Sequence, residues 1–199
     1  MRLFTMWRRR SVMRPEARIN RTWWLGTVLA VAANGAFAAD CDLRLSNAEV
    51  NYGDLNRAEM DIGQGLAPIA LGSRQLTLTA VCRQATTLRL HFDGEAADLD
   101  SYRFAGKGRF TVKLKNATLD GAAVQLAQTA GSTGGTAAAS TAVQLRPNQT
   151  VTAAAQGQRA VGKVFSVQVE IETYIDEAMT RTRDVTLLEG HGALTLDTQ

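Results

Sequence analysis

Two cysteines, each on an alternating run of side chains, constrain this chain more than any other feature. Cys82 ends the run 74–82, in which apolar residues occupy every second position from Leu76 onward. Cys41 begins a shorter run with the same period, continued by Leu43 and Leu45. A period of two is typical of a β-strand with one buried face. Both cysteines are therefore predicted to point inward from strands.

The first 38 residues have the composition of a secretory signal peptide. Residues 1–21 contain seven arginines and one acidic residue, an apolar run follows at 23–33, and Ala36–Phe37–Ala38 matches a small-x-small cleavage site. An N-terminal membrane anchor is the alternative, but the apolar run has about half of the roughly 20 residues needed to cross a bilayer. We therefore predict cleavage after Ala38, one domain spanning 39–199, and no membrane span once the leader is removed.

Removal of this leader changes the charge of the chain. Seven of the 22 basic residues and one of the 19 acidic residues lie in it, so the formal net charge goes from +3 to −3. No basic stripe remains of the kind that nucleic-acid binding requires. An oxidising compartment favours a disulfide between Cys41 and Cys82 over two reduced buried thiols. Such a bond closes a loop of about 40 residues, which the chain-entropy account values at roughly 4 kcal/mol.

Short strand patterns separated by turn residues account for most of the predicted domain. Residues 86–92 follow the first run after a short connection, which predicts an antiparallel hairpin. Residues 119–121 carry the Asp-Gly dipeptide of a two-residue hairpin, and 163–175 is predicted to be the longest strand and a central one. Residues 129–142, almost wholly Gly, Ala, Ser and Thr, are predicted to form a flexible loop. No run predicts a helix of ten or more residues, so the pattern favours an all-β sandwich.

No arrangement of residues is typical of a catalytic, cofactor or metal site. His91 and His191 lie in different predicted elements without metal-ligand spacing, and no serine has the G-x-S-x-G context of a nucleophile. Glu170 and Glu172 alternate along a predicted strand and are expected on a solvated face. Arg181 has the same exposed-strand explanation. We therefore predict a protein that is not an enzyme and uses no cofactor or metal.

Several short motifs resemble the fimbrial subunits (pilins) of bacterial chaperone–usher pathways, and most closely a proteobacterial group of fimbria-like exported proteins. The motifs are Cys41, residues 51–55, residues 76–82, Phe104 with Gly106, residues 119–121, Leu145 with Pro147, and residues 162–169. The resemblance covers most of the predicted domain. It implies an immunoglobulin-like, pilin-like β-sandwich that lacks its last strand. A periplasmic chaperone, and then the N-terminal arm of a neighbouring subunit, would fill the groove by adding a strand.

The resemblance also implies site residues and partners. The groove is expected to be lined by Phe165, Val167, Val169 and Ile171 and, near the chain end, by Leu194 and Leu196. A closed core built from the same residues is the alternative. The implied partners are a periplasmic chaperone, an outer-membrane usher and other pilus subunits. The implied location is the periplasm in transit and then a fimbrium on the cell surface.

Two features differ from ordinary pilins. Cleavage after Ala38 leaves only Ala39 and Asp40 ahead of the first cysteine, where pilins carry an arm, and the chain end lacks the near-terminal tyrosine of many chaperone-bound subunits. We therefore expect a tip or minor subunit that receives a strand without donating one, or a self-complemented subunit. The competing hypothesis is a closed, monomeric periplasmic or secreted β-sandwich that binds a small ligand or carbohydrate.

Overall fold

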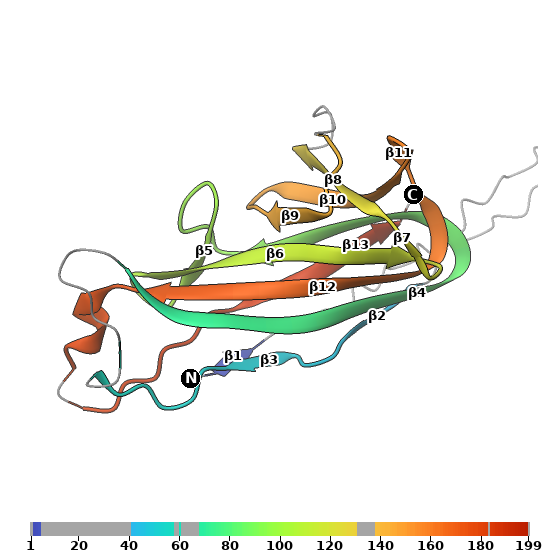
Figure 1. The fold of residues 1–199 in the computed structure, drawn as a ribbon. Helices are drawn as coiled ribbons and strands as arrows, with labels where there is room; N and C mark the ends of the chain where they lie inside the picture. The colour runs from blue at the N-terminus through green and yellow to red at the C-terminus, as the bar shows by residue number, and fades with distance from the viewer. Residues whose placement is uncertain are drawn as a thin grey trace, which may run out of the picture.

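The computed structural model describes residues 2–4, 41–57, 60, 68–130, 138–182 and 184–198, which form a curled antiparallel β-structure with almost no helix (Figure 1). Its elements are β1 (Arg2–Phe4), β2 (Cys41–Leu45), β3 (Glu49–Asn51), β4 (Ile69–Gly94), β5 (Tyr102–Phe104), β6 (Gly108–Leu119), β7 (Ala122–Ala123), β8 (Gln125–Ala130), β9 (Ala142–Leu145), β10 (Gln149–Ala155), β11 (Gln158–Arg159), β12 (Val161–Ile175), the 3-10 helix η2 (Glu177–Thr180) and β13 (Gly192–Thr198). The prediction of an all-β chain is confirmed.

β12 lies at the centre of the main sheet, between β4 and β6 (Figure 1). Its ladder with β4 runs from Val161 opposite Thr87 to Ile175 opposite Ile69. The central position predicted for this segment is confirmed. The prediction that it is the longest strand is wrong, because β4 has 26 residues and β12 has 15.

β4 runs without a turn through two parts of the curled sheet. Its first part pairs with β2 and β12, and its second part pairs with β10 and β13. Between them the register with β12 jumps, since Gly162 lies opposite Thr86 whereas Val164 lies opposite Val81. The hairpin predicted at this point is wrong. Residues 83–85 contain none of the Gly, Asn, Asp or Pro residues that favour tight turns, and the extra residues are accommodated as a bulge.

The Asp120–Gly121 turn joins β6 to β7, as the Asp-Gly dipeptide predicts. Both residues have positive φ, 50° and 84°, as a type I′ two-residue hairpin requires. The Asp120 carboxylate also accepts hydrogen bonds from the backbone N–H groups of Lys163 (3.0 Å) and Val164 (2.8 Å). The turn is therefore fixed to the start of β12.

The predicted boundaries of the leader and of the flexible loop fall partly outside the described residues. Of the predicted signal peptide 1–38, the structure describes β1, which pairs with β3 in a separate two-stranded sheet. Of the predicted loop 129–142, residues 131–137 lie outside the described ranges, and the two ends of the segment belong to β8 and β9. The leader, the loop and the single-domain boundary stay predictions.

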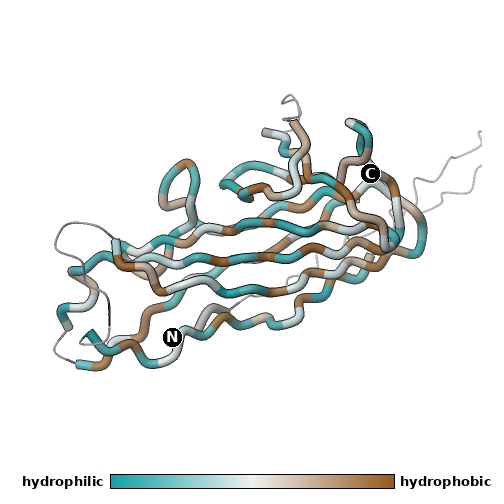
Figure 2. Tube along the Cα trace, in the orientation of Figure 1, coloured by the Kyte–Doolittle hydropathy of each residue, from teal (hydrophilic) through white to brown (hydrophobic). Residues whose placement is uncertain are grey.

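Inward-facing side chains of the strands form one hydrophobic core. Figure 2 shows hydrophobic and hydrophilic residues alternating along the strands that enclose it. An aromatic cluster of Phe92, Tyr102 and Phe110 lies in this core, with ring centroids 4.6 to 5.7 Å apart. The Tyr102 hydroxyl is buried without a hydrogen-bond partner among the described residues. Burial raises the pKa of this hydroxyl, because the protein interior disfavours the charged phenolate.

Candidate functional site

A disulfide joins Cys41, the first residue of β2, to Cys82 in β4. The two cysteines are direct cross-strand partners with Cα atoms 4.0 Å apart. The prediction of a disulfide is confirmed. β2 pairs with residues 78–82 of β4, and β13 pairs with residues 88–94. The first and last strands from Cys41 onward, β2 and β13, therefore both pair with β4, one on each side of its bulge.

Four of the predicted groove residues lie on the inward face of β12: Phe165, Val167, Val169 and Ile171. Each is at most 5% exposed. The backbone of β12 is already paired on both sides, with β4 and with β6. A strand added to the sheet would therefore reach these side chains across the core and would not pair with their backbone.

The other two predicted groove residues, Leu194 and Leu196, lie on β13 at an edge of the sheet. β13 pairs with β4 along its whole length, and β4 is its one partner strand among the described residues. Leu194 is buried, whereas Leu196 is half-buried. The six predicted groove residues are therefore divided between two places: four lie on the central strand β12, and two lie on the edge strand β13.

β2 and β13, which we call the terminal margin, leave several inward side chains partly exposed. Cys41, Leu43 and Leu45 on β2 and Leu196 on β13 pack against the core but are only half-buried. Within the described part of the chain, each strand pairs with β4 alone. Alternation in the sequence predicts that Leu43 and Leu45 face inward. It does not predict this incomplete cover, because alternation carries no information on what lies over a face.

A cavity of about 290 Å³, which we call the end pocket, lies at the end of β12 farthest from the disulfide. It is bounded by the residue before β4, the start of β6, the end of β12 and the region of η2. The lining residues are Pro68, Lys107, Arg109, Tyr174, Ile175, Asp176, Glu177, Ala178 and Arg181. Sequence analysis missed this pocket, because its residues come from separate segments and form no motif.

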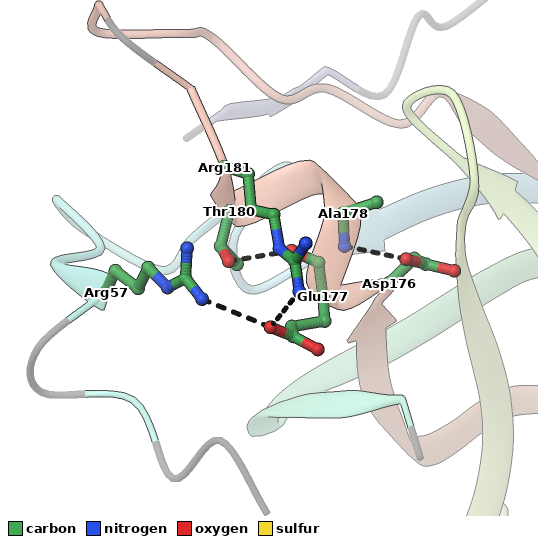
Figure 3. Close-up of polar contacts among 6 residues, drawn as sticks. All are labelled: Arg57, Asp176, Glu177, Ala178, Thr180 and Arg181. Carbon is green, nitrogen blue, oxygen red and sulfur yellow. Dashed lines mark hydrogen bonds and ion pairs between the residues drawn. The ribbon is translucent and has the colours of Figure 1, made fainter. Parts of the chain in front are cut away.

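Three charged residues of η2 and its ends, Asp176, Glu177 and Arg181, line the end pocket, and polar contacts hold them in place. Figure 3 shows these contacts. Asp176 caps the helix, since its Oδ1 accepts a hydrogen bond from Ala178 N at 2.7 Å. Glu177 Oε1 pairs with Arg57 at 3.1 Å and with Arg181 at 2.9 Å. The hydrogen bond to Glu177 raises the pKa of the Arg181 guanidinium. The prediction that Arg181 lies on an exposed strand is wrong, because the chain turns into η2 just before it.

Arg109 and Lys107 are the cations of the end pocket that pair with no carboxylate among the described residues. Arg109 Cζ lies 5.5 Å from the centroid of the Tyr174 ring, within the range of a cation–π contact. The Tyr174 hydroxyl donates a hydrogen bond to Glu172 Oε2 at 3.0 Å, and this bond raises the pKa of Tyr174. The ring that supports Arg109 is therefore itself held in place.

Two further ionisable residues, Glu170 and His91, lie outside both the terminal margin and the end pocket. Glu170 is not freely solvated, because it forms an ion pair with Lys115 of β6 and its side chain is 14% exposed. His91 of β4 lies 3.3 Å from Asp93 and 3.5 Å from Asp197 of β13. In the described ranges, no group of three or more His, Cys, Asp or Glu side chains is placed to hold a metal ion.

Comparisons with known proteins find no match for this chain, either among family profiles or among curated proteins. None of the helices in the described residues is long and apolar enough to cross a membrane. A function must therefore be inferred from the two features above, the terminal margin and the end pocket.

Proposed function

We propose that this protein is an exported fimbrial subunit, of minor or tip-like type, that accepts a β-strand from a neighbouring subunit with the help of a periplasmic chaperone and an outer-membrane usher. The observation that carries the proposal is the terminal margin. There, β2 and β13 each have one backbone edge unpaired within the described residues, next to half-covered inward side chains. A free edge beside an apolar row is what β-augmentation requires.

The pairing of β4 supports an incomplete, immunoglobulin-like sandwich as the finer description of the fold. β4 has different partners before and after its bulge, as expected of a strand that passes from one sheet of a sandwich to the other. One sheet would then contain β2, β12 and β6, and the other would contain β13, β10 and β8. A donated strand would cover Leu43, Leu45 and Leu196 and complete the sandwich.

The disulfide supports both export and an acceptor role. Disulfides persist in oxidising compartments such as the periplasm. Because the bond fixes Cys41 to β4, the chain from this residue onward is held in its own sheet. With the predicted cleavage after Ala38, only Ala39 and Asp40 would precede this bond, which is too short for an arm that reaches a neighbour, so the acceptor role is favoured over the donor role.

Photo-cross-linking in the native cells tests the acceptor role. Benzoylphenylalanine in place of Leu43 or Leu196 is expected to give adducts with a chaperone and with another subunit. The same replacement at Arg44 or Asp197, the exposed outward neighbours on the same strands, is the matched control and is expected to give few adducts. Equal yields at all four positions, or no adducts at the two leucines, would overturn the proposal.

A closed monomer that binds a small ligand or carbohydrate is the second candidate, and the end pocket favours it. The two candidates differ in the behaviour of the isolated, oxidised protein. A strand-accepting subunit is expected to aggregate, or to bind an added donor peptide with alternating apolar residues. A stable monomer that ignores such peptides favours the second candidate. Chaperone and usher genes next to this gene would favour the first.

A further inference from the structure

We propose that the end pocket binds a carboxylate, presented by an acidic sugar residue such as a hexuronic acid. The pocket is separate from the terminal margin, because it lies at the opposite end of β12 from the disulfide. Its volume of about 290 Å³ is near the lower limit of small-molecule sites, so it suits a single sugar residue. The proposal does not depend on strand addition.

Arg109 is the residue best placed to hold the carboxylate. Its guanidinium lies against the Tyr174 ring at 5.5 Å, and the hydrogen bond from Tyr174 to Glu172 fixes that ring. A guanidinium held in this way loses little rotamer freedom on binding, and its planar fork matches both oxygens of a carboxylate. No carboxylate among the described residues forms an ion pair with Arg109, and Asp98 acts on it only at longer range, so its guanidinium can take an incoming anion as its direct partner.

Lys107 supplies a second positive charge beside Arg109, and Gly108 between them brings both close to β12. A Cβ atom on Gly108 would lie 2.7 Å from the backbone oxygen of Phe104 and 3.0 Å from that of Tyr174. Any other residue at this position would therefore push the start of β6 away from β5 and from the end of β12. The glycine permits the close approach that places Lys107 and Arg109 in the pocket wall.

The charges of the wall favour a ligand with one negative charge. The lining residues carry three positive charges, on Lys107, Arg109 and Arg181, and two negative charges, on Asp176 and Glu177, so their net charge is +1. Glu177 is already engaged by Arg57 and Arg181. Asp176 adds one negative charge against the two positive charges of Lys107 and Arg109. Its Oδ1 caps η2 through Ala178 N, which leaves the other carboxylate oxygen as an acceptor for a hydroxyl group. A monovalent acid that also carries hydroxyl groups fits this arrangement better than a phosphate dianion or a neutral sugar.

Titration of the full exported chain, with its disulfide intact, against glucuronate, glucose and acetate tests the proposal by calorimetry and by amide chemical shifts. Glucuronate is expected to bind with a Kd on the order of 1 mM, and to bind more weakly as salt is added. Acetate is expected to bind at least about tenfold more weakly, because it makes the carboxylate contacts alone. If acetate binds as tightly as glucuronate, the proposal that the ligand is a sugar is overturned. Glucose binding as tight as glucuronate, or no glucuronate binding, would overturn the carboxylate site itself.

Variants that remove the same charge inside and outside the end pocket test whether glucuronate binds there. Arg109→Gln is expected to weaken glucuronate binding by at least about tenfold, and Lys107→Met by roughly threefold, in proportion to the charged hydrogen bonds lost. Arg159→Gln and Lys163→Met remove the same charges from exposed positions outside the pocket lining, and should change affinity by less than about twofold. If Arg109→Gln fails to fold, Lys107→Met still provides the test. Equal losses in pocket and control variants would show a general charge effect and overturn the site.

Discussion

Two margins of the same curled sheet carry the same alternating pattern but differ in how well they are covered. On β5 and β9, which both pair with β6, the inward side chains of Tyr102, Phe104 and Leu145 are 0% exposed. On the terminal margin, the inward side chains of Leu43 and Leu196 are half-buried. Alternation sets which face points inward. Whether that face is buried depends on which elements lie over it, and at the terminal margin this cover is incomplete.

The margin of β5 and β9 is also tied together by polar contacts that join its two parts to each other. Arg146, just after β9, pairs with Asp100 at 2.7 Å, and Gln144 of β9 donates to the Asp100 carbonyl at 2.7 Å. These contacts join β9 to the segment before β5. At the terminal margin, the strands are held to β4 by the disulfide, by the backbone ladders, and by the side-chain contacts of Thr195 with Asp93 and of Asp197 with His91. In one margin the two parts contact each other, whereas in the other margin β2 and β13 each pair with β4 among the described residues.

Loss of the disulfide should have the largest effect, and should act on the terminal margin. Replacing Cys41 and Cys82 together by alanine is expected to lower the free energy of unfolding by about 4 kcal/mol, because the unfolded chain regains the freedom of the closed loop. Urea unfolding measures this loss. Hydrogen exchange is expected to show a larger loss of protection in β2 than in β6, because β2 also loses its covalent tie to β4. Equal loss in both strands would break the distinction between the margins.

The next largest effect on stability is expected when a leucine is replaced by alanine, and the size of the loss should differ between the two margins. Leu145→Ala is expected to cost about 3 kcal/mol, because it removes a fully buried side chain from β9. Leu43→Ala, the matched change in β2, should cost only about 1 kcal/mol, since part of the side chain is already in contact with water. Urea unfolding of both variants provides the measurement. Costs that agree within error would mean that the two leucines are covered equally.

A smaller effect on the free energy of unfolding, and of opposite sign, is expected at Tyr102, whose hydroxyl group is fully buried. Tyr102→Phe should raise the free energy of unfolding by about 1 kcal/mol, because it removes a buried hydroxyl that lacks a partner among the described residues. The pKa of Tyr102 is raised in the folded state, so its ionisation favours unfolding as pH rises above about 10. The advantage of the phenylalanine variant should therefore grow above that pH. A destabilised variant would imply that the hydroxyl has a partner.

The smallest effect is expected at the solvent-facing ion pair between β6 and β12, which belongs to neither margin. Its loss gives a reference value for the changes in stability at the two margins. Lys115→Met should cost roughly 0.5 kcal/mol at neutral pH, as expected for a partly exposed ion pair with Glu170. The hydrogen bond to Lys115 lowers the pKa of Glu170 in the folded state. This contribution is therefore present above the pKa of the unfolded carboxyl and is lost as pH falls through the folded-state pKa. Thermal unfolding at neutral and acid pH checks this, and a cost that persists in acid would contradict it.

Local patterns predicted the directions of side chains but not the long-range pairings. Alternation correctly placed Leu78 and Phe165 in the core, and the Asp-Gly dipeptide correctly predicted a hairpin. The bulge at residues 83–85 depends on the register with β12, which lies far away in the chain. The end pocket likewise exists because β6 pairs with β12 and brings Arg109 opposite Tyr174. Neither residue belongs to a pattern that a local window of sequence could detect.

The position of the disulfide also determines how the two ends of the domain would carry tension. A force applied at Cys41 passes into β4 through a covalent bond, so β2 cannot unzip from its first residue. A force applied at Thr198 meets no covalent cross-link, and would open the β13 ladder one residue at a time from Leu88 toward Gly94. The sheet is mechanically locked at Cys41, whereas at Thr198 it is able to peel.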